Sequence, residues 1–308
     1  MAMHLPRWLL AQAMPLYGGG FWPAFTQLAL LYYSVGALLH WVVPSLLPVQ
    51  GIQVSQRKPG AVARDALYSL GPLAVKACVW VLVEQLHLRG WSRTYTGPLT
   101  SWQEVLYCCA ACAALDFLHD AWFYWTHRLL HCPALYRHVH YIHHKSTVPS
   151  AFTGYSFHVL EAALVFANEV LVVWLLPLHL GLHRMYHLVT TIVHLGGHAG
   201  YEMAPFIPTL EGLVLLALRG WRAHSPELNT VQHHDMHHRY PFAHFSLYFT
   251  HWDRWCGTLH AKYEDSLFRY FGAVNPASAP GMQSAGHRPN EADMARCSST
   301  PLRHAIHS

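Results

Sequence analysis

The chain has 308 residues, of which 53% are hydrophobic and only 12% are charged, whereas soluble globular domains carry about 25% charged residues. This composition predicts a membrane protein and argues against a soluble enzyme. The net charge is only +4, and the sequence contains no long basic run, so we expect no nucleic-acid partner. The seven cysteines follow neither a paired zinc-type spacing nor a secreted disulfide framework.

Three apolar segments are long enough to cross a hydrocarbon core of about 30 Å. The stretch before them lacks the order of a cleaved signal peptide, so we expect it to lie at the membrane interface. We predict the spans at residues 25–47, 66–88 and 102–125. The second and third spans contain the ionisable residues Lys76, Glu84, Asp116 and Asp120. Such residues usually face a protein interior, so we expect these two spans to face each other rather than lipid.

A fourth apolar stretch, residues 157–193, is interrupted by Pro177, Gly181 and Arg184. We expect it to form a helical hairpin that enters and leaves the membrane on one side, with both ends at histidine-rich segments. Residues 203–222 are too short and too broken by proline for a span, so we expect an interfacial or cytosolic helix. From about residue 273 onward Pro, Ser, Ala and Gly predominate, which predicts disorder.

Three histidine clusters stand out beside these spans. They contain eight residues: His127, His131, His140, His143, His144, His234, His237 and His238. Residues three and four apart share a helix face, so we expect each cluster to project two or three imidazoles in one direction. Imidazole suits iron, zinc, copper and nickel. A zinc ion takes about four ligands, so eight histidines predict two metal ions.

The spacing also bears on the kind of metal site. Soluble di-iron bundles use paired Glu-x-x-His motifs, and only Glu84 and His87 stand at that spacing here. The zinc-protease motif His-Glu-x-x-His is absent from the sequence. An all-imidazole site for two metals favours redox iron over hydrolysis. Two alternatives from other classes stay open, a histidine-rich membrane metal transporter and a di-zinc hydrolase.

Five segments, taken in order, carry a family resemblance: DAWFYWTHRLLH (120–131), LYRHVHYIHH (135–144), HAGYE (198–202), HHDMHH (233–238) and FTHWDRWCGTL (249–259). Together they resemble the sterol desaturase and fatty acid hydroxylase superfamily, and within it most closely the C-4 methylsterol monooxygenases and cholesterol 25-hydroxylase. The resemblance covers roughly residues 115–260, about half of the chain.

The resemblance implies a non-haem enzyme with two iron ions in the endoplasmic reticulum membrane, with its active site facing the cytosol. It implies that the enzyme hydroxylates or desaturates a sterol-like lipid with O2 and NAD(P)H-derived electrons, delivered by cytochrome b5 or its reductase. The sequence contains no His-Pro-Gly-Gly haem motif, so we expect the donor to be a separate protein. A fatty acid or sphingolipid substrate is the alternative within the superfamily.

The resemblance also extends the ligand set. It adds His198 as a ninth ligand, and His158 either as a ligand or as a partner of one. His194, four residues before His198, stays open as a neighbour on the same helix face, and His233 is expected to orient its neighbours.

Metal-bound histidines usually donate their other ring N–H to a carboxylate or carbonyl. We therefore expect supporting catalytic roles for Asp120, Tyr124, Asp235 and Asp253. Asp120 lies two helical turns, about 10 Å, from His127, so we expect it to reach Tyr124 or a histidine of another segment. For Asp253 the alternative is a cap of the turn before Gly257. Glu161 and Glu202 are read either as further partners of ligands or as interfacial charges.

The predicted fold class is therefore all-α: about four to five membrane helices or re-entrant hairpins with a cytosolic histidine-rich helical cap. We divide the chain into N-terminal membrane helices (1–114), a fatty acid hydroxylase-type di-metal domain (115–262) and a mostly disordered tail (263–308). If the cap is cytosolic, the loop with Arg57, Lys58 and Arg64 is cytosolic as well. The positive-inside rule agrees, although Arg89 and Arg93 on the opposite loop keep the bias small.

Overall fold

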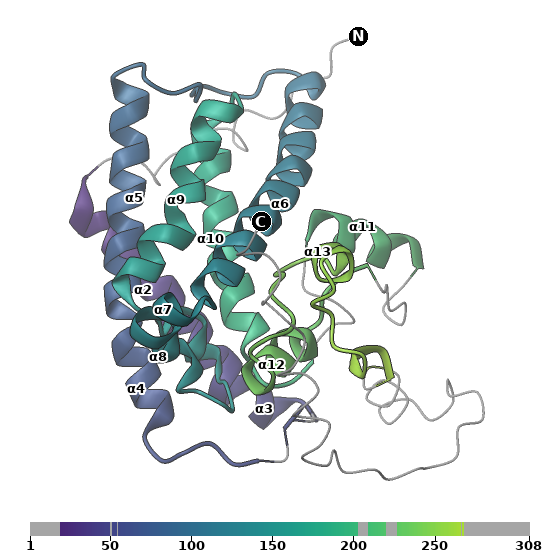
Figure 1. Cartoon of the computed structure of the whole chain (residues 1–308). Coiled ribbons are helices and arrows are strands. Elements are labelled where there is room, and N and C mark those ends of the chain that lie inside the picture. Colours follow the sequence, from purple (N-terminus) through teal and green to yellow (C-terminus); the bar gives the residue numbers. More distant parts are fainter. Residues whose placement is uncertain are drawn as a thin grey trace, which may run out of the picture. The chain divides into compact units, whose positions relative to one another are not determined.

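The computed structural model describes residues 19–49, 51–53, 55–202, 209–219, 227–265 and 267. Within these residues the regular elements are all helices (Figure 1), which confirms the predicted fold class. The chain divides into two units, Met1–His260 and Ala261–Ser308, and the elements below belong to the first. The expectations for the N-terminal stretch and for the tail from residue 273 lie outside the described residues.

Three helices of the described chain are long and apolar enough to cross a membrane, at Phe21–Leu46, Ala61–Leu88 and Trp102–Leu130. They correspond to the three predicted spans, with ends shifted by a few residues. The first consists of α2 (Phe21–Ala37), a π-helical turn (Leu38–Val42) and α3 (Val43–Leu46). The second consists of α4 (Ala61–Tyr68) and α5 (Leu70–Leu88), and the third is α6 (Trp102–Leu130).

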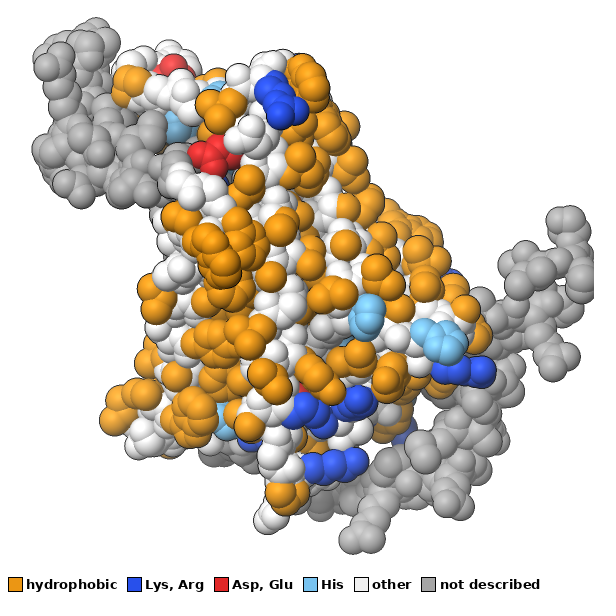
Figure 2. Space-filling view, turned by 90° about the vertical axis from the view of Figure 1, so that its left-hand side faces the viewer, with side chains coloured by type: hydrophobic (Ala, Val, Ile, Leu, Met, Phe, Trp, Pro, Cys, Tyr) orange, Lys and Arg blue, Asp and Glu red, His pale blue; other side chains and the backbone are white. Residues whose placement is uncertain are grey.

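The outer surface of this bundle is apolar. Large side chains such as Trp22, Leu30, Leu82 and Leu106 are exposed. Figure 2 shows apolar side chains over much of one face, with Lys and Arg gathered toward the lower end. A soluble monomer rarely exposes so much contiguous apolar surface, so this face is suited to contact with lipid.

The predicted hairpin is present as α9 (Val159–Leu175) and α10 (Leu180–Gly197), which run in opposite directions (Figure 1). Of the three expected breaks, only Pro177 lies in the turn, while Gly181 and Arg184 lie inside α10. The turn is held by Tyr95 of the α5–α6 loop, whose amide donates to the Leu178 carbonyl (3.0 Å) and whose carbonyl accepts from the Leu180 amide (2.8 Å).

The expectation that the second and third spans face each other is wrong, because the hairpin provides their polar partners. Lys76 on α5 forms a buried ion pair with Glu169 on α9. Asp116 on α6 accepts a hydrogen bond from the Tyr186 hydroxyl on α10 (2.8 Å). Lys76 and Asp116 therefore face the protein interior, as expected of a membrane helix, but their partners are on the hairpin.

Short helices follow α6 and the hairpin; α7, α8 and α12 lie toward the lower end of the bundle, and α11 and α13 lie higher, beside α6 (Figure 1). After α6 come α7 (Pro133–Leu135), a π-helical turn (Tyr136–His140), α8 (Tyr141–His144) and a 3₁₀ helix (Ala151–Tyr155). After the hairpin come α11 (Leu210–Arg219), α12 (Val231–Arg239) and α13 (His251–Trp255). Helix α11 lies within the expected 203–222 segment, of which residues 203–208 and 220–222 are not described.

Candidate metal centre

Five histidines form the first of two groups that could hold a metal ion. They come from α6 and its C-cap, the π-helical turn, α8 and α12, and are His127, His131, His140, His144 and His237. Their ligand nitrogens lie within 4.8 Å of one another. The Nε2 atom of His237 lies 3.1 Å from the Nε2 atoms of both His131 and His144.

Four buried histidines form the second group: His143, His198, His234 and His238. His198 directly follows α10, so the hairpin delivers it to the cap. Its Nε2 lies 2.8 Å from the Nε2 of His234 and 3.4 Å from that of His143. The ring centroids of His144 and His238 lie 5.1 Å apart, so the two groups are neighbours.

Two of the three histidine clusters contribute to both groups, which differs from the expectation that a cluster points in one direction, whereas His127 and His131 both belong to the five-histidine group. On α8, His143 belongs to the four-histidine group and His144 to the five-histidine group. On α12, His237 and His238 are divided in the same way. Consecutive residues of an α-helix are rotated by about 100°, because there are 3.6 residues per turn. Adjacent histidines can therefore serve two neighbouring metal ions.

The second ring nitrogen of four of these histidines is fixed by a hydrogen bond. The Nδ1–H of His127 donates to the Phe245 carbonyl (3.0 Å), and that of His237 donates to the Ala243 carbonyl (2.7 Å). The Nδ1–H of His198 donates to the His194 carbonyl (2.7 Å).

The fourth such bond goes to a carboxylate, because the Nδ1–H of His140 donates to Glu161 (2.8 Å). Each of these bonds places the proton on Nδ1 and leaves the Nε2 lone pair directed at the centre of its group.

Burial keeps these imidazoles neutral. Desolvation is the largest cause that lowers their pKa, and the charge of neighbouring imidazoles adds to it at most positions. Desolvation lowers the pKa of His198 to about 4. It lowers the pKa of His131, His140, His143, His144, His234, His237 and His238 as well. At neutral pH these side chains are therefore in the form that binds metals.

The arrangement of lone pairs fits a metal ion. His237 and His198 each direct an Nε2 lone pair at two other Nε2 atoms, but one lone pair can accept only one N–H. A cation in the middle would satisfy all of these nitrogens at once. Two nitrogens bound to one ion at about 2.0 to 2.1 Å lie about 2.8 to 3.0 Å apart at a right angle and about 3.3 to 3.4 Å apart in a tetrahedron. The observed separations of 2.8 to 3.4 Å match this range.

Asp253 holds the loop whose carbonyls orient His127 and His237. It accepts hydrogen bonds from the amides of Phe245 (2.9 Å) and Ser246 (3.0 Å), and its Oδ2 lies 3.2 Å from His233 Nε2. Burial opposes ionisation of Asp253, but the hydrogen bonds from His233 and Ser246 outweigh it and hold the pKa below its usual range. Asp253 also accepts from the Thr258 hydroxyl (2.7 Å), so the expected turn-capping role is present too.

Asp120 supports the same loop, rather than Tyr124 or a histidine as expected. Its Oδ1 accepts from the amides of Leu247 (2.9 Å) and Tyr248 (2.7 Å). These loop residues lie more than 120 positions after Asp120 in the chain. Helix spacing alone cannot predict a contact between residues so far apart in sequence. The Tyr124 hydroxyl pairs with the Thr258 hydroxyl (3.1 Å).

The remaining predicted site residues, Asp235 and His158, make other contacts. Asp235 accepts from Gln53 (2.8 Å) and pairs with Arg239 (3.2 Å) instead of bonding to an imidazole. His158 lies outside both groups: it caps α9, and its Nδ1 accepts from the Leu160 amide (3.1 Å).

A small cavity of about 20 Å³ connects the two groups. Its wall includes His127 and His140 of one group, His143, His198 and His234 of the other, and the apolar side chains Phe123, Leu130, Phe157 and Val165. Gly154 closes one side, where an added Cβ would lie 2.7 Å from the His194 carbonyl oxygen. Glycine at this position thus lets the 3₁₀ helix approach α10. His194, left open by the sequence, lines the cavity and belongs to neither group.

Sequence reasoning missed two kinds of supporting residue. The carbonyls of Ala243 and Phe245 act through the backbone, so side-chain identity gives no signal for them. Asp65 was missed because the predicted second span begins one residue after it, whereas the helix begins at Ala61. A carboxylate beside an apolar run was the available signal.

Comparison with known proteins shows that residues 112–258 match the fatty acid hydroxylase family. The chain is similar to methylsterol monooxygenase 1 of Rattus norvegicus, with 27% identity over 51% of this chain and 48% of that protein. It is similar to the C-4 methylsterol oxidase of Schizosaccharomyces pombe, with 32% identity over 44% and 43% of the two chains. It is also similar to a cholesterol 25-hydroxylase-like protein of Danio rerio, with 33% identity over 51% and 57%.

The matched part of the chain thus spans about half the length of these relatives. No solved structure matches the chain significantly. The family match contains all nine histidines of the two groups, together with Asp120 and Asp253.

Proposed function

We propose that this chain, a member of the sterol desaturase and fatty acid hydroxylase superfamily, is a membrane-bound oxygenase with two non-haem iron ions that hydroxylates or desaturates a sterol-like lipid. The observation that carries the proposal is the convergence of nine histidines in two neighbouring groups beside an apolar-walled cavity. The names of the relatives favour lipid oxidation as the general activity.

The nine histidines would hold the two ions, five around one and four around the other. Bound iron would supply the reduction of O2 and the oxidation of an unactivated C–H bond. For hydroxylation the balance is one lipid C–H, one O2, two electrons and two protons to one alcohol and one water. We propose that the electrons come from NAD(P)H through cytochrome b5 or its reductase.

The residues of the chain contribute positioning and exclusion of water. Phe123, Leu130, Phe157 and Val165 provide an apolar wall beside the ligand histidines, which disfavours competing water at the site. Glu161 and the Phe245 and Ala243 carbonyls hold three ligand rings in place. Asp120 and Asp253 act through the loop that carries these carbonyls, so we assign them as positioning residues.

A sterol is the proposed substrate because relatives are named as methylsterol, lathosterol and cholesterol-type oxidases. A fatty acid or sphingolipid is the alternative, since the matching family is described as fatty acid hydroxylase. We place the enzyme in the endoplasmic reticulum membrane with the cap in the cytosol, where soluble reductants are available.

The test is metal content together with aerobic turnover of detergent-purified protein on sterols, fatty acids and sphingoid lipids with NADPH and a cytochrome b5 reduction system. We expect about two irons per chain and an oxidised sterol. His143→Ala should lower both, whereas His138→Ala, an exposed histidine of the same segment outside both groups, should change neither. Two zinc ions after iron-replete preparation, with no O2 consumption on any lipid, would instead favour hydrolysis or metal handling.

A further inference from the structure

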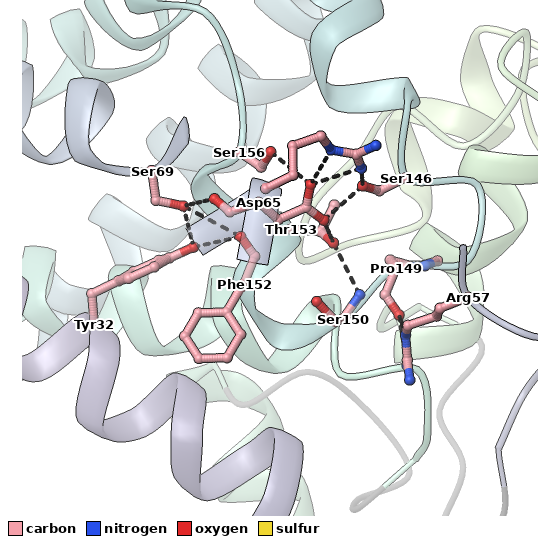
Figure 3. A network of polar contacts seen from close by, with 11 residues as sticks. Tyr32, Arg57, Asp65, Ser69, Ser146, Pro149, Ser150, Phe152, Thr153 and Ser156 are labelled. Carbon is pink, nitrogen blue, oxygen red and sulfur yellow. Dashed lines mark hydrogen bonds and ion pairs between the residues drawn. The ribbon is translucent and has the colours of Figure 1, made fainter. Parts of the chain in front are cut away.

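A buried carboxylate in the N-terminal helices holds the segment that links the histidine cluster of α8 to the hairpin. Asp65 lies on α4, is 1% exposed, and stands outside the family match at residues 112–258. Figure 3 shows its side chain among three hydroxyl groups of this segment. Its Oδ2 accepts from Ser146 (2.6 Å) and Thr153 (2.8 Å), and its Oδ1 accepts from Ser156 (3.1 Å).

The segment held in this way, residues 146–156, borders the metal centre at both ends. Ser146 stands two residues after His144, and its amide donates to the His143 carbonyl (3.3 Å). At the other end, Gly154 and Phe157 line the cavity between the two groups. The chain then enters α9, where Glu161 orients His140.

The hydrogen-bond directions require an acceptor at Asp65. The Ser146 hydroxyl oxygen already accepts from Arg64, and the Thr153 hydroxyl oxygen accepts from the Ser150 amide (2.9 Å). Both hydroxyl protons are therefore directed to the carboxylate. An amide side chain would place an N–H group toward one of these donors or toward Arg64, whose guanidinium donates to Oδ1 (2.9 Å).

Tyr32 of α2 and Arg57, in the loop before α4, hold the same segment by its backbone (Figure 3). The Tyr32 hydroxyl donates to the Phe152 carbonyl (2.7 Å), and the Tyr155 amide donates to the Tyr32 oxygen (3.2 Å). Arg57 donates twice to the Pro149 carbonyl (2.9 and 2.8 Å). The segment is thus held along its length by residues that belong to neither histidine group.

We propose that Asp65 is a positioning residue of the metal centre, which fixes residues 146–156 and thereby places His143 and His144, one ligand from each group. The inference rests on the proposed function only in taking the two histidine groups to be metal sites. It predicts that loss of the Asp65 carboxylate loosens both ions, because the two neighbouring ligands belong to different groups.

The test compares Asp65→Asn with Glu169→Gln in the full chain. Glu169 is equally buried and also accepts hydrogen bonds from charged and ring donors, Lys76 and Trp80, but none of these partners lies in 146–156. Metal release to a chelator and the visible spectrum of the Co²⁺-substituted protein are measured, with the thermal unfolding midpoint as the measure of general stability. Changes to the surroundings of metal ligands typically cost about 10- to 100-fold in affinity.

We expect both variants to unfold at lower temperature, but only Asp65→Asn to release both metals at least about tenfold faster and to change the Co²⁺ spectrum. Unchanged release from Asp65→Asn, or equal acceleration in Glu169→Gln, would overturn the proposal. If Asp65→Asn does not fold, Ser146→Ala and Ser156→Ala replace it, with the exposed Ser45→Ala as control. Release no faster than in that control would also overturn it. None of these readouts depends on lipid oxidation, so failure to oxidise a sterol leaves this test intact.

Discussion

A neutral imidazole binds a metal through one nitrogen while the other carries a proton, so each ligand here is defined by what its second nitrogen contacts. Three of the four fixed rings donate to backbone carbonyls. His140 differs, because its partner is the Glu161 carboxylate. A negative partner makes the imidazole a stronger donor to a cation, so His140 should depend most on its partner.

We therefore predict that Glu161→Ala lowers affinity for the ion of the five-histidine group by about 10- to 100-fold. Glu161→Gln keeps an oxygen acceptor for His140 but loses the charge, so its effect should be smaller. Competitive titration with a chelator measures both, with Glu84→Gln near the far end of α5 as the control. Equal affinity in all four proteins would mean that the Glu161 contact does not orient His140.

Glu202 gives a second prediction at the scale of one residue. It accepts from the amides of Val231 (3.2 Å) and Gln232 (2.7 Å) at the start of α12. Burial raises its pKa to about 7 from an ordinary 4.5, against the opposing effect of these amides. The folded chain therefore keeps a proton that the unfolded chain loses. The stabilising contribution is complete below about pH 4.5 and is lost as pH rises through about 7.

For Glu202 this loss amounts to about 3 kcal/mol of unfolding free energy, at about 1.4 kcal/mol per pKa unit. Glu202→Gln cannot ionise, so the variant should gain stability relative to the original chain between pH 5 and pH 8. The difference between their thermal unfolding midpoints measures this, and the titration of the buried histidines cancels in that difference. A difference that stays constant with pH would contradict the raised pKa.

At the scale of elements, the loop between α12 and α13 acts as the outer support of the five-histidine group. Asp253 bonds the loop from α13 and Asp120 bonds it from α6. The supported carbonyls, Ala243 and Phe245, contact only ligands of that group. The four-histidine group depends instead on the end of α10, through His198.

Asp253→Asn should therefore weaken one ion more than the other. The amide would direct N–H groups toward donors at Ser246 or Phe245, which should cost about 3 kcal/mol of stability and loosen His127 and His237. We expect metal content to fall from two ions toward one per chain, measured by elemental analysis after dialysis against a chelator. Asp116→Asn, which changes another buried carboxylate, should keep both ions. Equal loss of both ions from Asp253→Asn would argue against a loop dedicated to one group.

The elements themselves were largely predictable, because apolar length and histidine spacing are local properties of the sequence. The three spans and the hairpin follow from runs of Leu, Val and Ala between turn residues. What could not be predicted was the division of His143 and His144 between two groups, since shared helix faces describe only residues three and four apart. The packing partners of the spans are also not a local property of the sequence. The predicted pairing of the second and third spans was wrong for that reason.

At the scale of the whole molecule, the metal centre is assembled from segments far apart in the chain and supported in part by residues outside the family match. Asp120 meets Leu247, and Asp65 meets Ser156, across long stretches of sequence. A single sequence carries no pairing information at such distances. The histidines were identifiable because their chemistry is unusual, whereas Asp65, Tyr32 and Arg57 are ordinary residues whose importance depends on what the fold places beside them.

The same arrangement determines how the molecule should sit in a membrane. Exposed basic residues of the described chain gather at the end that carries the cap: Lys58, Arg137, Lys145 and Arg239. The opposite end, the α5–α6 loop, exposes Arg89 and Arg93. Basic residues in short loops favour the cytosolic side, so this asymmetry supports the proposal that the metal centre lies at the cytosolic surface.

Membrane orientation can be tested with two positions at opposite ends of α6. Cys132 is exposed just after α6, and Thr96 is exposed in the loop before it. In a background without the other cysteines, we expect an impermeant maleimide to label Cys132 in sealed vesicles whose cytosolic face points outward. Thr96→Cys, in a background that also lacks Cys132, should be labelled only after permeabilisation. The reverse pattern would place the histidines on the far side, away from cytosolic reductants. Labelling of both positions in intact vesicles would mean that α6 does not cross the bilayer, and the apolar surface of the bundle would then need a protein partner rather than lipid.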